Sequence, residues 1–357
     1  MKANFLRASS CGAPRVPALA QAVRRLPGLL LLAPFGAWGV CALAYGSWPK
    51  PACVALAALY GAAHLAVILF APLRRVAPGC AAAFLLPLAA FHLMQPSNDR
   101  AWQPDVARLP YAVVSGDQVT VHHVRNCLYH SETNFVVRYE TRRYDLAKLR
   151  SADIFLVDWG LHKVAHAMIS FGFDDGQYLC FSIETRKEAG EGYSAFRGLF
   201  RQYEVIFVAG DERDLVGLRT NYRSGETARL YRMVKAPPAA VRGAFVDYLE
   251  RINGLARRPE WYNAMTENCM VGFFQIARHH AVKGRGRWHW SVLLNGYADR
   301  RAYETGALDT TLPFDELRAR SIVNDRARAA GRSPTFSAQI REGLPGIDPA
   351  PQKEAQP

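Results

Sequence analysis

The first quarter of the chain alternates long uncharged runs with short basic connections. The uncharged runs cover residues 26–48, 51–73 and 77–94. Each is about as long as a helix needs to be to cross a ~30 Å hydrocarbon layer, so the pattern predicts three transmembrane helices within residues 26–95. In an alternative interpretation, the first run is a signal peptide cleaved after the small residues at 42–44, and the other two runs remain as spans.

The basic residues around these runs predict an orientation. Five Lys or Arg residues and no acidic residue precede the first run, the connection between the first two runs has only Lys50, and the next connection has Arg74 and Arg75. Because basic residues stay on the cytoplasmic side, we expect residues 1–25 in the cytoplasm and everything after residue 95 outside. The chain would then be a multi-pass inner-membrane protein with a periplasmic domain.

Residues 96–345 mix strand and helix patterns, which predicts an α+β domain. A proline-rich tail, 346–357, is expected to be disordered. Runs of alternating or continuous apolar residues favour strands at 118–125, 134–140, 152–159, 204–209 and 229–234, and helical spacing favours helices at 239–255 and from Cys269 onwards.

A hairpin is predicted where 166–173 and 177–185 flank Asp174-Asp175-Gly176. Glycine suits the left-handed position that ends a three-residue loop. With this loop, His166 faces Glu184 across the ladder on one side of the sheet. A turn one residue shorter would put Thr185 in that place.

Cys269 is the candidate nucleophile. It follows Asn268, a helix N-cap residue, and a thiol in the first turn of a helix feels partial positive charge that favours the thiolate. We expect His166 to be the base and Glu184 to orient its ring. The plainer interpretations are a small buried cysteine, a structural histidine and a cross-strand ion pair.

Charge and cysteine content narrow the possible functions. The net charge is +13, but the first 97 residues hold eight basic and no acidic residues, which leaves +5 over the remaining 260. No basic helix or aromatic platform for nucleic acid is evident. Among the exported cysteines, either Cys127 and Cys180 form a disulfide or all three thiols are free, and both alternatives leave Cys269 unpaired.

No metal or cofactor is expected. His162 and His166 would share a helix face, as in a zinc protease, but Lys163 stands where that chemistry needs a glutamate. The polar loop after the hairpin, with Arg186 and Tyr193, could bind a substrate head group together with Asn268, or it could simply be solvated. The basic and aromatic segment 284–290 fits a membrane-interface role or a plain surface.

Several blocks in one order carry a resemblance to a known family. They are 165–173 (AHAMISFGF), 181–188 (FSIETRKE), 198–204 (GLFRQYE), 211–214 (DERD), 261–263 (WYN) and 266–269 (TENC). On these blocks, residues 97–345 resemble the family named after the periplasmic N-terminal domain of Lnb, a lipoprotein N-acyltransferase. The family is similar to circularly permuted papain-like (NlpC-like) thiol enzymes, in which the histidine precedes the cysteine.

The resemblance implies a membrane-anchored thiol acyltransferase acting on phospholipid or lipoprotein acyl groups, with Cys269 as nucleophile and His166 as base. One departure is Met270, where a small hydroxyl residue is expected. Because one fold hosts several chemistries, two alternatives stay open: a peptidoglycan amidase or endopeptidase, and a non-catalytic periplasmic binding domain. The last predicts that the thiol and the imidazole do not bond.

Overall fold

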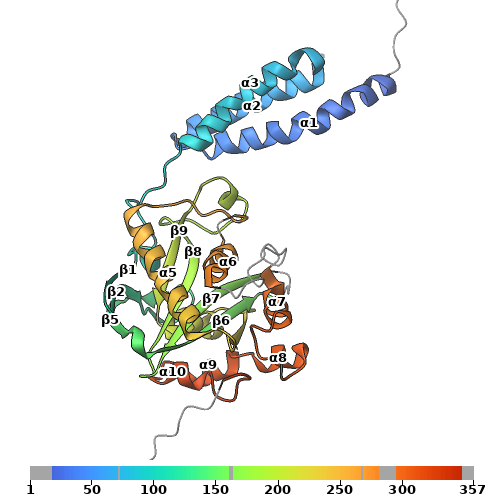
Figure 1. The fold of residues 1–357 in the computed structure, drawn as a ribbon. Coiled ribbons are helices and arrows are strands. Elements are labelled where there is room, and N and C mark those ends of the chain that lie inside the picture. Colours follow the sequence, from blue (N-terminus) through green and yellow to red (C-terminus); the bar gives the residue numbers. More distant parts are fainter. Residues whose placement is uncertain (1–17, 71–72, 161–163, 267, 281–294, 348–357) are drawn as a thin grey trace, which may run out of the picture. The chain divides into compact units, whose positions relative to one another are not determined.

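The computed structural model describes residues 18–70, 73–160, 164–266, 268–280 and 295–347 (Figure 1). The chain divides into two compact units, Met1–Gln95 and Pro96–Pro357, and each is considered by itself. Some expectations concern segments outside the described residues. These are most of the cytoplasmic segment 1–25, His162, the basic segment 284–290 and most of the tail 346–357.

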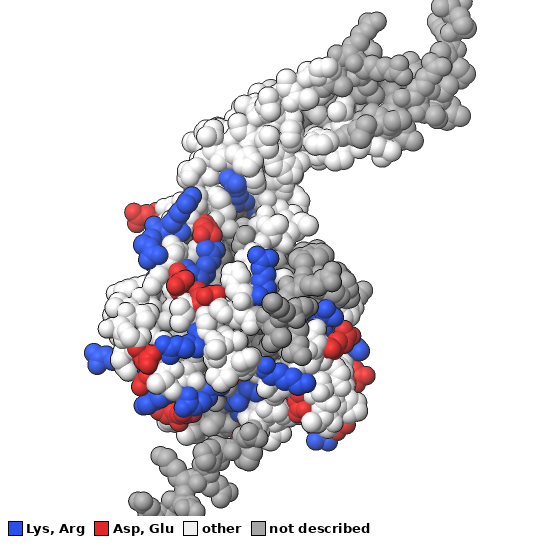
Figure 2. Space-filling view, in the orientation of Figure 1, with Lys and Arg blue, Asp and Glu red and all other residues white. Residues whose placement is uncertain are grey.

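The first unit consists of three helices, α1 (Ala18–Ala44), α2 (Lys50–Phe70) and α3 (Leu73–Leu93). Among the described helices, α2 is long and apolar enough to cross a membrane, whereas the apolar parts of the other two, Leu32–Ala44 and Pro78–Leu93, are shorter. The three-span arrangement therefore stays a prediction. In Figure 2 the described part of this unit is almost free of charge, whereas both signs of charge are interspersed over the visible face of the second unit.

An eight-stranded mixed sheet is the centre of the second unit. Seven strands run in the order β1-β2-β9-β8-β7-β6-β10, and β5 pairs with β2. The strands are β1 (Tyr111–Ser115), β2 (Gln118–Arg125), β5 (Tyr139–Asp145), β6 (Leu149–Asp158), β7 (Ala165–Phe173), β8 (Tyr178–Arg186), β9 (Glu204–Gly210) and β10 (Thr227–Arg232). A separate pair, β3 (Leu128–Tyr129) and β4 (Phe135–Val136), lies off the sheet.

Helices cover both faces of the sheet. Its central strands carry apolar side chains on both faces, and both faces must therefore be buried. The odd-numbered residues of β7, from Ile169 to Phe173, pack with α5 (Pro238–Arg257) and α6 (Cys269–His280). Met168, the residue before Ile169, packs on the other face. That face is covered by α4 (Glu212–Gly217), α9 (Asn324–Ala330) and α10 (Phe336–Gln339), while α7 (Ala298–Glu304) and α8 (Phe314–Arg320) lie near α6 (Figure 1). The expected α+β class is confirmed, and the papain-like permutation stays a prediction.

The β7–β8 hairpin has the register expected from its turn. Gly176 adopts a φ of 81°, in the left-handed region, and Met168 pairs with Ser182. This pairing excludes the shorter turn and puts His166 and Glu184 at corresponding positions, just beyond the last pair of the ladder.

A glycine lets α6 approach β8 closely. A Cβ atom on Gly272 would lie 2.6 Å from Cδ1 of Ile183, so the helix can take this position only because no side chain is present there. Since Gly272 is one turn after Cys269, this approach sets the height of the thiol above the sheet.

Candidate active site

Asn268 caps the helix that carries the candidate nucleophile. Its Oδ1 accepts the backbone N–H groups of Met270 and Val271, both at 3.0 Å, and its Nδ2 donates to the carbonyl of Ala264 at 3.0 Å. The amide thus satisfies two of the unpaired donors of the first turn. The expected N-cap is confirmed. Because the amide is buried and used in this way, Asn268 serves here to place Cys269 at the start of α6.

The Cys269 thiol is buried and mainly protonated at neutral pH. Burial raises the pKa of this thiol, and the hydrogen bond from the Ala167 N–H and the charge of Arg219 oppose the increase without cancelling it. The N–H groups of Met270 and Cys269 at the helix start also lower this pKa, which is the expected direction, but the net pKa is raised. The desolvation cost of a buried sulfur outweighs the partial charge of the helix terminus, so a base is needed to remove the proton.

His166 and Glu184 are connected through a residue that the sequence did not single out. The Nε2 atom of His166 lies 2.8 Å from Oγ of Ser182, and the same Oγ donates to Oε1 of Glu184 at 2.8 Å. Arg219, on the π-helical turn Leu218–Tyr222, forms an ion pair with Glu184, with its guanidinium nitrogen 3.6 Å from Oε1. The carboxylate therefore acts on the imidazole through the Ser182 hydroxyl.

Glu184 and His166, the two ends of this hydrogen-bonded chain, both have strongly shifted pKa values. Burial alone would raise the pKa of Glu184, but Arg125 and Arg219 lower it to about 2, so the carboxylate is charged at neutral pH. Burial, followed by the charge of Arg219, lowers the pKa of His166 to about 3, so the ring is neutral.

The protons of this chain define the tautomer of His166. A charged Glu184 can only accept, so Ser182 gives its one hydroxyl proton to it. The Ser182–His166 hydrogen bond then needs its proton on Nε2. A neutral ring with a proton on Nε2 has a bare lone pair on Nδ1, and no hydrogen bond to Nδ1 is present within the described part of the chain. His166 is thus prepared to accept a proton at Nδ1.

The Cys269 thiol and the His166 imidazole lie on opposite faces of the sheet at β7. Side chains alternate along a strand, so His166 shares the face of Met168, whereas Cys269 packs on the face of Ile169. The backbone N–H of Ala167, the residue after His166 and just beyond the last β7–β8 pair, acts on the Cys269 sulfur and lowers the pKa of this thiol. No hydrogen bond joins the sulfur to the His166 ring in the described structure, which is what the non-catalytic alternative predicts.

The two candidate head-group residues have different environments. Arg186 is buried, donates to the carbonyls of Val106 and Ala107 at 3.0 and 2.8 Å, and stacks on Trp102. Its guanidinium anchors the segment that enters the domain. Tyr193 is exposed and stacks on Tyr203, with ring centroids 6.2 Å apart, so it is accessible to a ligand.

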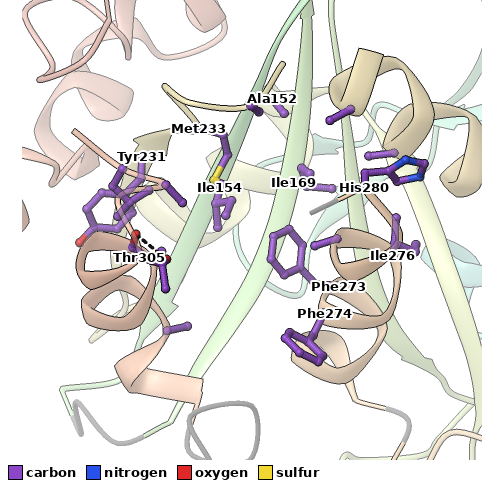
Figure 3. A pocket seen from close by; sticks show the side chains of 18 of the residues that line it. Ala152, Ile154, Ile169, Tyr231, Met233, Phe273, Phe274, Ile276, His280 and Thr305 are labelled. Atoms are coloured by element: carbon purple, nitrogen blue, oxygen red, sulfur yellow. Dashed lines mark hydrogen bonds between the residues drawn. The ribbon is translucent and has the colours of Figure 1, made fainter. Parts of the chain in front are cut away.

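An apolar cavity of about 250 Å³ extends beside α6 (Figure 3). Met270 and Phe273 of α6 line it, together with Ile154 and Ile169 of the sheet and Tyr231 of β10. Cavities of this size and lining suit small, mostly apolar ligands. The first of these residues directly follows Cys269, so the cavity adjoins the helix turn that holds the thiol.

The cysteines of the second unit are all free. Cys127 and Cys180 form no disulfide, which leaves the alternative with three free thiols. The described residues include no cluster of three or more His, Cys, Asp or Glu side chains that could hold a metal ion.

Fold and site together define a mixed α+β domain with a buried cysteine at a helix start, beside a histidine-bearing strand. Residues 135–296 match the family model described as the Lnb N-terminal periplasmic domain, the family that the sequence blocks resemble. No curated protein and no solved structure matches the chain. The family and the apolar helix α2 indicate a periplasmic domain that is associated with a membrane.

Proposed function

We propose that the second unit is a thiol acyltransferase that takes acyl groups from a phospholipid or lipoprotein. The observation that carries the proposal is the Glu184–Ser182–His166 chain, which leaves Nδ1 of His166 bare one residue before Ala167, whose backbone N–H lowers the pKa of the Cys269 thiol. The neutral ring can accept the thiol proton only as the sulfur attacks, because its pKa of about 3 is too low for a stable thiolate–imidazolium pair.

In the first half of the proposed reaction, the Cys269 sulfur attacks the ester carbonyl and Nδ1 of His166 takes the thiol proton. The C–O bond of the ester then breaks, the alcohol leaves with that proton, and a thioester remains on Cys269. An amine attacks the thioester in the second half, loses a proton to His166, and the proton returns to the sulfur as the thioester breaks. Water in place of the amine makes the same site a hydrolase.

The proposal makes two demands on the site. His166 must turn towards the sulfur across the open end of the β7–β8 ladder. The developing oxyanion also needs a donor, and the Asn268 cap already holds the N–H groups of Met270 and Val271, so the N–H of Cys269 itself is our candidate. The cavity beside α6 would hold the acyl chain, because its lining is almost wholly apolar.

The absence of a direct bond between the thiol and the imidazole favours a second candidate, a binding domain without turnover. Incubation of the full-length protein in nanodiscs with phospholipid bearing a labelled acyl chain separates the two. Transfer of label to an added lipopeptide amine, lost in Cys269→Ala, supports the transferase, and release as free fatty acid supports the hydrolase. Retention of unreacted phospholipid by both proteins would support binding alone, and release of muropeptides from peptidoglycan would replace the lipid proposal.

A further inference from the structure

Loops at the Cys269 end of the sheet expose large apolar side chains. Tyr193 and Phe196, in the β8–β9 loop, are 57% and 52% exposed, and Met265, in the loop before α6, is 58% exposed. Trp159 and Val164 are also about half exposed, at 47% and 48%. We call these five residues the thiol-side rim.

The strand order puts the rim at one end of the sheet. β6 ends just before Trp159 and β7 begins just after Val164, while β8 ends and β9 begins around the loop with Tyr193 and Phe196. These four strands are neighbours and run antiparallel, so the ends of β6 and β8 lie side by side with the starts of β7 and β9. Apolar groups gathered on one end of a domain usually mark an interaction site.

The loops that carry Tyr193 and Met265 are held in shape with these two side chains turned outward. The Tyr203 hydroxyl donates to the carbonyl of Gly192 at 2.7 Å and accepts the N–H of Ser194 at 3.0 Å, on either side of Tyr193. Before α6, Oδ1 of Asn263 accepts the N–H groups of Met265 and Thr266. Ordered backbone on both loops means that the exposure belongs to the folded state.

The chain also enters the domain at this end. Ser97 donates its N–H to Glu204 at the start of β9 at 3.0 Å, and Gln103 donates its N–H to the carbonyl of Lys187 at 2.9 Å. The segment that follows the apolar helices is thus fixed beside the rim loop. This loop also carries Lys187, and Arg197, which pairs with Glu191 at 2.6 Å. Aromatic rings with neighbouring cations are typical of surfaces that rest in a lipid interface.

We propose that the thiol-side rim docks on the surface of the bilayer that the protein's own helices enter. Trp159, Tyr193 and Phe196 rest among the lipid head groups with Met265 and Val164. Docking needs neither the thiol nor turnover, so it can be tested independently of the proposed function.

The test uses full-length protein in nanodiscs that contain a phospholipid with a photoactivatable diazirine on its acyl chain. We expect adducts on the tryptic peptide with Tyr193 and Phe196. In the peptide with Met265 we expect them on residues 259–266, which fragment spectra separate from the α6 residues of the same peptide. The double variant Tyr193→Ser, Phe196→Ser should lower the adducts on the unchanged Met265 peptide about tenfold or more, because burial of one large apolar side chain shifts an equilibrium by roughly that factor.

Two controls complete the experiment. Val234→Ser changes an exposed apolar residue just after β10, at the other end of the sheet, and should leave the adducts unchanged, as should Cys269→Ser. Equal labelling of the rim variant and the wild type would overturn the proposal, and so would adducts confined to α1, α2 and α3. Protein–protein cross-links between rim peptides would also overturn it, because a second copy would then occupy the rim.

Discussion

At the scale of single residues, Ser182 is the side chain that turns three polar groups into a directed proton chain. Its hydroxyl donates a hydrogen bond to Glu184 and accepts one from the Nε2–H group of His166. The sequence contains a usable signal for it, because residues two apart on a strand share a face, and 182 is two before 184. Arg219 had no such signal, since its π-helical turn meets Glu184 only in the folded domain.

Replacing Ser182 by Ala should lower the rate of acyl transfer about 10–100-fold. Without the hydroxyl, the Glu184 carboxylate no longer holds the proton of His166 on Nε2. Ser170→Ala is a matched control. This serine is equally buried on the same strand face of the sheet as His166, but its Oγ has no hydrogen-bond partner in the described structure. Its loss should leave the rate unchanged, and equal effects of both variants on the rate would contradict the proton chain.

The tautomer itself can be observed by ¹⁵N NMR of histidine-labelled protein. We expect the His166 signals to show a proton on Nε2 and a bare Nδ1 from pH 8 to about 4, because burial lowers the pKa of this ring to about 3. His166→Asn assigns the signals by removing them. A ring protonated on Nδ1, or one that titrates near its ordinary pKa of about 6.5, would contradict the assignment.

The same shift predicts how stability depends on pH. The unfolded chain binds a proton on His166 near pH 6.5 and the folded chain only near pH 3, so stability falls as the pH falls through this window. Glu184, with a folded pKa of about 2, adds a further loss below about pH 4.5. In thermal unfolding scans, His166→Asn should remove the loss between pH 6.5 and 4.5, whereas replacement of the exposed His130 should retain it.

At the scale of elements, the sequence predicted what local chemistry controls. The turn Asp174-Asp175-Gly176 and the alternation of its flanks were sufficient for the β7–β8 register, and the cap at Asn268 was sufficient for the start of α6. The face on which α6 packs depends on contacts distant in the sequence, such as Gly272 against Ile183, and these were not predictable from local pattern. Arg186 looked like part of a solvated loop for the same reason, since its carbonyl partners lie about 80 residues earlier.

The cap of α6 can be tested separately from the chemistry. Asn268→Ala should destabilise the domain by about 1 kcal/mol, because two backbone N–H groups lose their acceptor, and it should slow any reaction at Cys269 by loosening the first turn. Asn268→Asp retains a capping oxygen and should remain close to wild type in a thermal unfolding scan. If Asn268→Asp lost as much stability as Asn268→Ala, the loss would not come from the missing cap.

At the scale of the whole molecule, the proposal requires the second unit to be outside the cytoplasm. Alkaline phosphatase fused after Gln95 should be active, whereas a fusion after Arg75 should be inactive, because basic residues hold that connection in the cytoplasm. Activity at both positions would contradict three spans with a cytoplasmic N-terminus. The intact mass of the membrane protein distinguishes the alternative, since cleavage of a signal peptide would remove its first residues.

The most direct test of the central claim is intact mass spectrometry of the full-length protein after incubation with phospholipid in nanodiscs. Thiol acyl transfer predicts a mass increase of one acyl chain, mapped to Cys269, removed by hydroxylamine and absent from Cys269→Ala. The adduct should form about 10²–10⁴ times more slowly in His166→Ala, which lacks the base. Unmodified Cys269 in wild-type protein with bound phospholipid, or an adduct that forms at the same rate without His166, would contradict the account.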